Sequence, residues 1–112
     1  MAKDVKEKDG NVQDETLLLV SGCKDKTKEE IKEYVKSLSN AILQTLYKHG
    51  KARLRGVGAG AGNNADKAII IAKGESQKRG DRLLVDLSFT TVSFGGDLKT
   101  GILKEVFIVN NK

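Results

Sequence analysis

The chain has 112 residues, enough for one domain with a single core, and a formal net charge of +5. Its one cysteine and one histidine exclude an internal disulfide and a zinc site built from cysteine and histidine ligands. No apolar run approaches the roughly 20 residues of a membrane-spanning helix, and charged residues dominate the start of the chain, where a signal peptide would be apolar. We therefore expect a cytoplasmic protein without a membrane segment.

Residues 1–15 are polar and charged and show no periodicity, which predicts a disordered tail followed by one domain over residues 16–112. The tail holds three lysines and five acidic residues, whereas the domain holds seventeen basic and ten acidic residues. The domain is thus more basic than the whole chain. This excess suits a polyanionic partner, and it equally suits a solvated surface that maintains solubility.

The first strand and the first helix are indicated by an apolar run and a capping signal. Four consecutive apolar residues within Thr16–Ser21 predict a buried strand. Thr27 and Glu30 have the spacing of a capping box, and apolar residues then recur at steps of three and four until Gly50. We therefore predict an amphipathic helix over residues 27–49, preceded by a polar, basic loop.

Residues 51–57 alternate between apolar and basic side chains. Ala52 and Leu54 would face a core, whereas Arg53 and Arg55 would point to the opposite side of the same strand. The pattern therefore predicts a half-buried strand with a basic outer face.

A glycine-rich turn over residues 56–64 leads into a second predicted helix. Asn63 or Asn64 would cap this helix, which is predicted over residues 65–73. Its central segment, residues 68–72, is apolar on nearly all sides. We therefore expect this segment to be deeply buried.

The last third of the chain predicts a polar loop and then a β-hairpin with strands over residues 82–94 and 100–110, joined at a turn containing Gly95 and Gly96. The side chains expected to share the core-facing side of its first strand are Leu83, Val85, Leu87 and Phe89. The order β-α-β-α-β-β with right-handed crossovers predicts an α/β fold (α+β, two layers), in which two helices cover one face of a four-stranded mixed sheet.

The glycine-rich turn is the most distinctive candidate for a binding site. Glycines let a backbone approach a ligand closely, and free N–H groups at a helix start attract anions. The pattern that begins at Gly58 lacks the last glycine of a dinucleotide fingerprint, and no Gly-Lys-Ser/Thr follows. Three interpretations stay open: close packing of helix and sheet, a site for a small anionic ligand or nucleotide, and backbone contacts to phosphates through Gly60, Gly62, Asn63 and Asn64.

Basic residues fall into groups that would bind a polyanion if they shared one surface, and the alternative is a scatter of solvated charges. The groups are Lys24, Lys26 and Lys28 around the first loop, Arg53 and Arg55 on the second strand, Lys78, Arg79 and Arg82 before the third strand, and Lys99 after the hairpin turn. Phe94, beside that turn, is the one aromatic residue expected to be exposed for stacking. Isolated carboxylates and a histidine at a helix end form no acid–base pair, so we expect no enzymatic activity and no cofactor.

Three segments of the chain carry a family resemblance. They are Lys-His-Gly-Lys-Ala-Arg-Leu-Arg-Gly-Val-Gly-Ala-Gly-Ala over residues 48–61, its continuation over residues 64–74, and the stretch from Leu83 through Phe89 and Thr90 to residues 100–102. Together they resemble the stage V sporulation protein S family of the Alba-like superfamily. The similarity covers roughly residues 17–109, and the Gly-Ala-Gly-Ala turn is its most specific part.

This resemblance implies an Alba-like bacterial regulatory protein that binds DNA or RNA, forms a homodimer and has no catalytic activity. It implies contacts from the first loop, from the second strand with its following turn, and from the hairpin, and so from the site residues given above. Alba proteins carry basic residues in the turn where this chain has glycines. The alternative is a protein-interaction module that does not bind nucleic acid. The acidic excess of residues 1–15 would shield the basic surface, so deleting it is expected to tighten binding.

Overall fold

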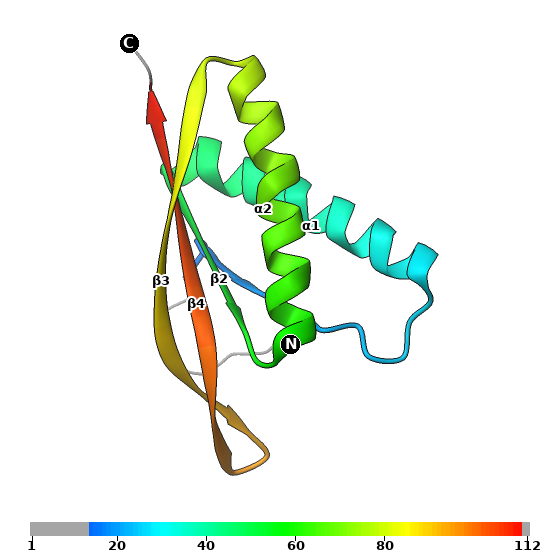
Figure 1. Ribbon diagram of the computed structural model, residues 1–112. Coiled ribbons are helices and arrows are strands. Elements are labelled where there is room, and N and C mark those ends of the chain that lie inside the picture. Colours follow the sequence, from blue (N-terminus) through cyan, green and yellow to red (C-terminus); the bar gives the residue numbers. More distant parts are fainter. Residues whose placement is uncertain (1–13, 111–112) are drawn as a thin grey trace.

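A computed structural model describes residues 14–110, which form two helices on one face of a four-stranded sheet (Figure 1). The elements are β1 (Leu17–Leu19), α1 (Lys28–His49), β2 (Lys51–Gly56), α2 (Ala59–Lys78), β3 (Asp81–Phe94) and β4 (Asp97–Asn110). The strand order is β1-β2-β4-β3, with β1 parallel to β2 and the other pairs antiparallel. The predicted element order and mixed two-layer fold are confirmed. The predicted disordered tail falls mostly on residues outside the described range.

Helix α1 begins and ends where its local signals predict. The Glu30 backbone N–H donates to Thr27 Oγ1 (3.1 Å), and the Thr27 N–H donates to Glu30 Oε1 (2.9 Å). This capping box satisfies backbone donors at the helix start. At the other end Gly50 adopts φ +85°, and its N–H donates to the Leu46 carbonyl. A left-handed glycine of this kind ends a helix without the steric cost that a Cβ atom would bring.

Helix α2 is longer than predicted at both ends. It begins at Ala59 inside the glycine-rich segment and continues through Gly74 to Lys78. The prediction that Asn63 or Asn64 caps the helix is therefore wrong, because Gly58 is the N-cap residue and no side chain caps the start. The inward side of the helix explains the extension, since it carries small residues that are at least 97% buried, namely Ala61, Ala65, Ala68 and Ala72. Their close packing on the sheet outweighs the low helix propensity of the glycines.

The predicted burial of residues 68–72 is only half correct. Ala68, Ile69 and Ala72 are buried, but Ile70 and Ile71 are 66% and 44% exposed. The reason is that α2 lies on a single face of the sheet, so its outer side has no element of this chain above it (Figure 1). An apolar run in a helix is buried all round only when neighbours surround it.

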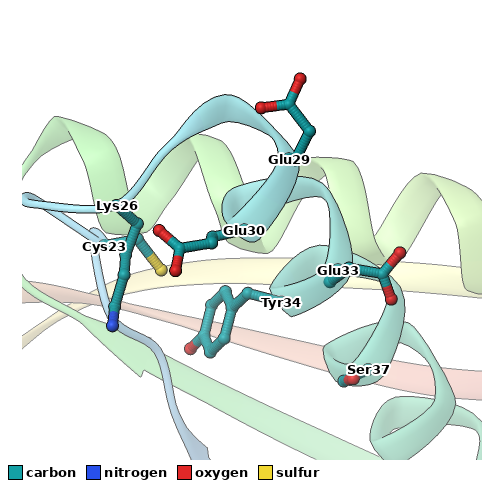
Figure 2. Close-up of a pocket in the computed structure, with 7 residues that line it drawn as sticks. All are labelled: Cys23, Lys26, Glu29, Glu30, Glu33, Tyr34 and Ser37. Carbon is teal, nitrogen blue, oxygen red and sulfur yellow. The ribbon is translucent and has the colours of Figure 1, made fainter.

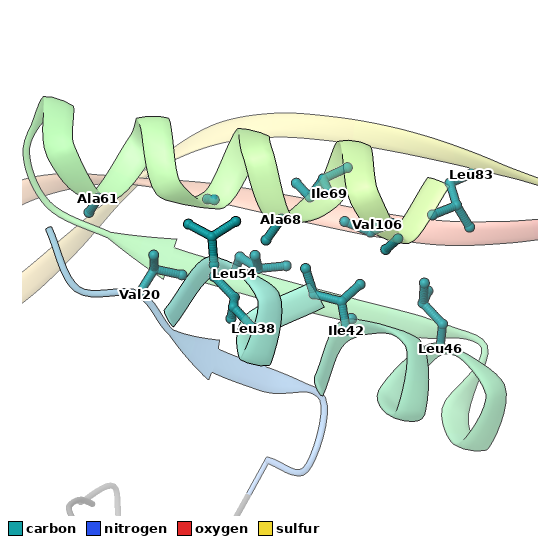
Figure 3. Packing of buried hydrophobic residues seen from close by; sticks show 14 residues of the cluster. Val20, Leu38, Ile42, Leu46, Leu54, Ala61, Ala68, Ile69, Leu83 and Val106 are labelled. Atoms are coloured by element: carbon teal, nitrogen blue, oxygen red, sulfur yellow. The ribbon is translucent and has the colours of Figure 1, made fainter. Parts of the chain in front are cut away.

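The hydrophobic core lies between the two helices and the middle of the sheet (Figure 3). Ile42 and Leu46 of α1 point toward Leu54 of β2 and Val106 of β4, and all four are at most 1% exposed. Ala68 of α2 closes the layer at 0% exposure. These five residues therefore join both helices to the two central strands.

The β3–β4 hairpin is longer than the helices that cover it. A strand of 14 residues spans about 46 Å, whereas the 20 residues of α2 span about 30 Å. The core-facing side of β3 is therefore covered only near its start. Leu83 is 7% exposed, but Leu87 and Phe89 are 62% and 81% exposed. The prediction that Phe89 faces a core is wrong for this reason.

Two glycines bring the β2–α2 turn close to its neighbours. A Cβ atom added at Gly56 would lie 2.8 Å from the Ala61 Cβ and 3.2 Å from the Val20 carbonyl oxygen. One added at Gly101 of β4 would lie 2.7 Å from the Gly56 carbonyl oxygen. The turn is thus packed between the start of α2 and strand β4. This supports the close-packing interpretation of the first glycine in the turn.

We predict that Leu54→Ala lowers the free energy of unfolding by about 2 to 5 kcal/mol, because it leaves a cavity at a side chain that is 1% exposed. Urea denaturation followed by circular dichroism measures this change. Leu98→Ala is the matched control, since Leu98 is 75% exposed and its truncation should change stability by less than about 0.5 kcal/mol. Equal effects of the two variants would contradict the position of the core.

We predict that Gly56→Ala destabilises the protein by about 1 to 3 kcal/mol, because the new methyl group overlaps Ala61. Gly62→Ala, within α2, meets nothing within 4 Å and should be neutral or stabilising by up to about 1 kcal/mol through helix propensity. Thermal unfolding of both variants distinguishes the two positions. A Gly56→Ala protein as stable as the parent would show that the turn does not need this close approach.

Candidate nucleic-acid interface

Three connecting segments meet at one end of the molecule, in the lower part of Figure 1. They are the β1–α1 loop, the β2–α2 turn and the distal half of the hairpin. The Asn64 side-chain amide donates to the Ser21 carbonyl (3.0 Å), which joins the loop to the start of α2. The close approach of Gly22 to Gly60, and of Gly101 to Gly56, completes the assembly. Segments that are distant in the sequence therefore form one surface.

The loop lysines of the predicted site follow the contact at Gly22 in the chain and are exposed. Lys24 and Lys26 are exposed in the β1–α1 loop, and Lys28 is exposed in the first turn of α1. Lys99 is exposed on β4, paired with Val92 near the end of the hairpin. Exposed lysines contribute charge to a polyanion without a fixed geometry. The arrangement suits contacts to phosphates rather than recognition of bases.

The predicted glycine and asparagine residues have different roles within the first turns of α2. Gly60 is packed against Gly22, whereas Gly62 has open space at its Cα. Asn64 is 3% exposed and holds the loop through Ser21, so its role here is structural, and Asn63 is exposed. The first N–H groups of a helix have no partner within it. They point toward the same end of the molecule as the lysines.

The two arginines of β2 lie on the sheet face away from the helices, opposite the buried Ala52 and Leu54. Arg55 immediately precedes the glycine turn and has no ion-pair partner among residues 14–110. Arg53 lies farther from the three segments. It forms an ion pair with Asp14, and its Nε donates to Thr16 Oγ1 (3.3 Å). The structure thus places Arg55 directly before the glycine turn and pairs Arg53 with Asp14 instead.

A hollow of about 450 Å³ beside the loop lysines does not extend the basic surface (Figure 2). Its lining includes Glu29, Glu30 and Glu33 against a single lysine, Lys26. The Tyr34 hydroxyl, also in its wall, accepts a hydrogen bond from the Ser21 N–H (2.8 Å) and so supports the loop. An acidic lining of this kind repels phosphates. Within residues 14–110, no cluster of three or more histidine, cysteine or acidic side chains could hold a metal ion.

An exposed apolar surface was not predicted from the sequence. It consists of Val85, Leu87 and Phe89 of β3, Ile102 of β4 and Ile70 of α2, which are all more than 40% exposed. Phe89 and Ile102 are paired across the hairpin, and Leu87 lines a common hollow with them. The Asp66 carboxylate of α2 lies 2.9 Å from Lys104 Nζ on β4. Ile70 follows Asp66 by one helical turn and therefore lies on the same side of α2 as Asp66, toward the hairpin. The sequence held a signal for this exposed surface, because the strands of the hairpin are too long for either helix to cover along their full length.

The family model described as Stage V sporulation protein S (SpoVS) matches residues 30–109, from the first turn of α1 to the end of β4. No helix in the described part of the chain is both long and apolar enough to cross a membrane. Because the match covers most of the chain and both helices, the chain belongs to the stage V sporulation protein S family.

Proposed function

We propose that this chain is a non-enzymatic regulatory protein of the cytoplasm that binds nucleic acid through phosphate contacts. The supporting observation is that contacts join the β1–α1 loop, the β2–α2 turn and the hairpin. Lys24, Lys26 and Lys99 are exposed on the loop and the hairpin, Lys28 is exposed in the first turn of α1, and Arg55 directly precedes the turn. The stage V sporulation protein S family is not known for enzymatic activity. Binding that depends on such contacts is sensitive to salt and has little base specificity.

We predict that replacing Lys24, Lys26 and Lys28 together by alanine weakens binding and flattens its dependence on salt. For duplex DNA, the slope of log K against log salt should become shallower by about 0.9 for each phosphate that the variant no longer neutralises. Fluorescence anisotropy with labelled duplex DNA, single-stranded DNA and RNA measures the affinities and identifies the preferred polymer.

The matched control replaces Lys36, Lys67 and Lys73, which are exposed on the helices and belong to none of the predicted basic groups, and so removes the same charge. Affinity that falls equally in both triple variants would show that only net charge matters. Absence of binding to all three polymers at low salt would contradict the proposed function.

A homodimer is the second part of the proposal, and the exposed apolar surface supports it. A monomeric protein seldom exposes a continuous apolar patch of this kind without a partner. A standard interface covers about 800 Å² on each partner, a small part of the 7274 Å² surface of one chain. A second copy docked here would cover the part of the hairpin that α2 leaves open. The same surface makes a protein-interaction module the alternative function, with a different protein as the partner.

We predict that Leu87→Asp converts a dimer to a monomer, because it places a charge within the apolar surface. Sedimentation equilibrium should give twice the 12.2 kDa chain mass for the parent and the single mass for the variant. Leu84→Asp is the control, since Leu84 is 49% exposed on the opposite face of the same strand. A monomeric parent would favour the alternative function, and a dimeric Leu87→Asp protein would place the interface elsewhere.

A further inference from the structure

A second group of basic side chains lies beyond the loop lysines, where α1 ends and β2 begins. Its members are Lys48 and His49, the last residues of α1, and Arg53 of β2, which we call the Lys48–His49–Arg53 cluster. Carboxylates of the chain's own N-terminal segment occupy this cluster. Glu15 Oε1 lies 3.4 Å from His49 Nε2 and 3.9 Å from Lys48 Nζ, and Asp14 forms an ion pair with Arg53. The cluster therefore binds anionic oxygens in the structure itself.

The segment that supplies these carboxylates is fixed to β2 by its backbone. The Arg53 N–H donates to the Thr16 carbonyl (2.7 Å), and Leu17 continues as the strand partner of Arg53. The Asp14 side chain is oriented by the Thr16 N–H and hydroxyl, which donate to its Oδ1 over 2.9 and 2.6 Å. Its other carboxylate oxygen, Oδ2, is the one paired with Arg53. The segment therefore holds Asp14 against the guanidinium with little freedom.

The contacts remain accessible to a competing anion. The side chains of Arg53 and Asp14 keep 25% and 37% of their surface exposed, and those of Lys48 and Glu15 keep 72% and 64%. Ion pairs this exposed are weak and are screened by salt. A polymer with many phosphates, by contrast, gains from each counterion that it releases. Arginine also matches phosphate oxygens with two parallel N–H donors, as it matches a carboxylate.

We propose that the Lys48–His49–Arg53 cluster is a phosphate-binding subsite for nucleic acid, which Asp14 and Glu15 occupy as internal competitors in the free protein. This inference rests on the proposed function. Arg55 connects the subsite to the glycine turn, since it lies two residues from Arg53 on the same face of β2 and directly precedes Gly56. Displacement of the two carboxylates extends the basic surface from the glycine turn along the sheet to the end of α1.

The test is the double variant Asp14→Asn with Glu15→Gln in the full chain, measured by anisotropy over a salt series on the polymer that the parent binds best. Asparagine and glutamine keep the size of the original side chains and one accepting oxygen, so Thr16 can still donate to residue 14, whereas the NH2 group that replaces the second oxygen cannot accept from Arg53. Roughly three- to tenfold tighter binding at low salt is expected. The salt dependence should also steepen, by about 0.9 for each additional phosphate contacted on duplex DNA.

Two further variants make the result specific. Glu75→Gln with Asp86→Asn changes the net charge equally at exposed positions outside the cluster and outside the hollow, and an equal increase in affinity in that control overturns the inference. Adding Arg53→Gln to the double variant should abolish the increase, and a retained increase also overturns it. An unchanged double variant beside a binding parent overturns the subsite and leaves the proposed function intact. Absence of binding by parent and double variant alike overturns both.

Discussion

The close contact between the end of β2 and the start of α2 determines where the rest of the surface lies. Gly56 leaves no room for a side chain beside Ala61, and Gly101 leaves none beside the Gly56 carbonyl oxygen. Because these positions lack bulk, α2 begins directly on the sheet and a row of alanines continues the contact along the helix. The loop before α1 then packs against the same helix start through Ser21 and Asn64. Small residues at this junction therefore bring together three segments that would otherwise be separate.

The mismatch in length between the hairpin and the helices has the opposite effect, because it leaves apolar side chains without cover. Burial of apolar surface is worth about 25 cal/mol per Å², so exposed side chains such as Leu87 and Phe89 represent stabilisation that this chain does not obtain by itself. The same hairpin carries Lys99 toward the end where the loop lysines lie. One structural feature thus links the proposed dimer contact with the proposed nucleic-acid contact.

Several basic side chains are paired within the chain, although the chain as a whole is basic. Arg53 on the open sheet face meets Asp14, and Lys48 at the end of α1 meets Glu15. On the helix side, Lys104 is 8% exposed and is paired with Asp66, a contact that compensates for the cost of burying an ammonium group. Basic side chains without an ion-pair partner among residues 14–110 include the loop lysines, Arg55 and Lys99, and they also include Lys36, Lys73 and Arg82 on other parts of the surface. Net charge alone does not reveal this distribution.

Features that depend on neighbouring residues could be predicted from the sequence without the structure. The capping box at Thr27, the helix end at Gly50, the alternation along β2 and the hairpin turn all act within a few residues, and they led to the correct order of elements. The family followed separately, from the resemblance of the segments around the glycine-rich turn. The extent of α2, the exposure of Ile70 and Phe89, and the pairing of Arg53 with Asp14 became evident only from the tertiary structure. Each of these depends on which distant element lies above a side chain. Periodicity tells which side of an element a residue occupies, but it does not tell whether another element covers that side.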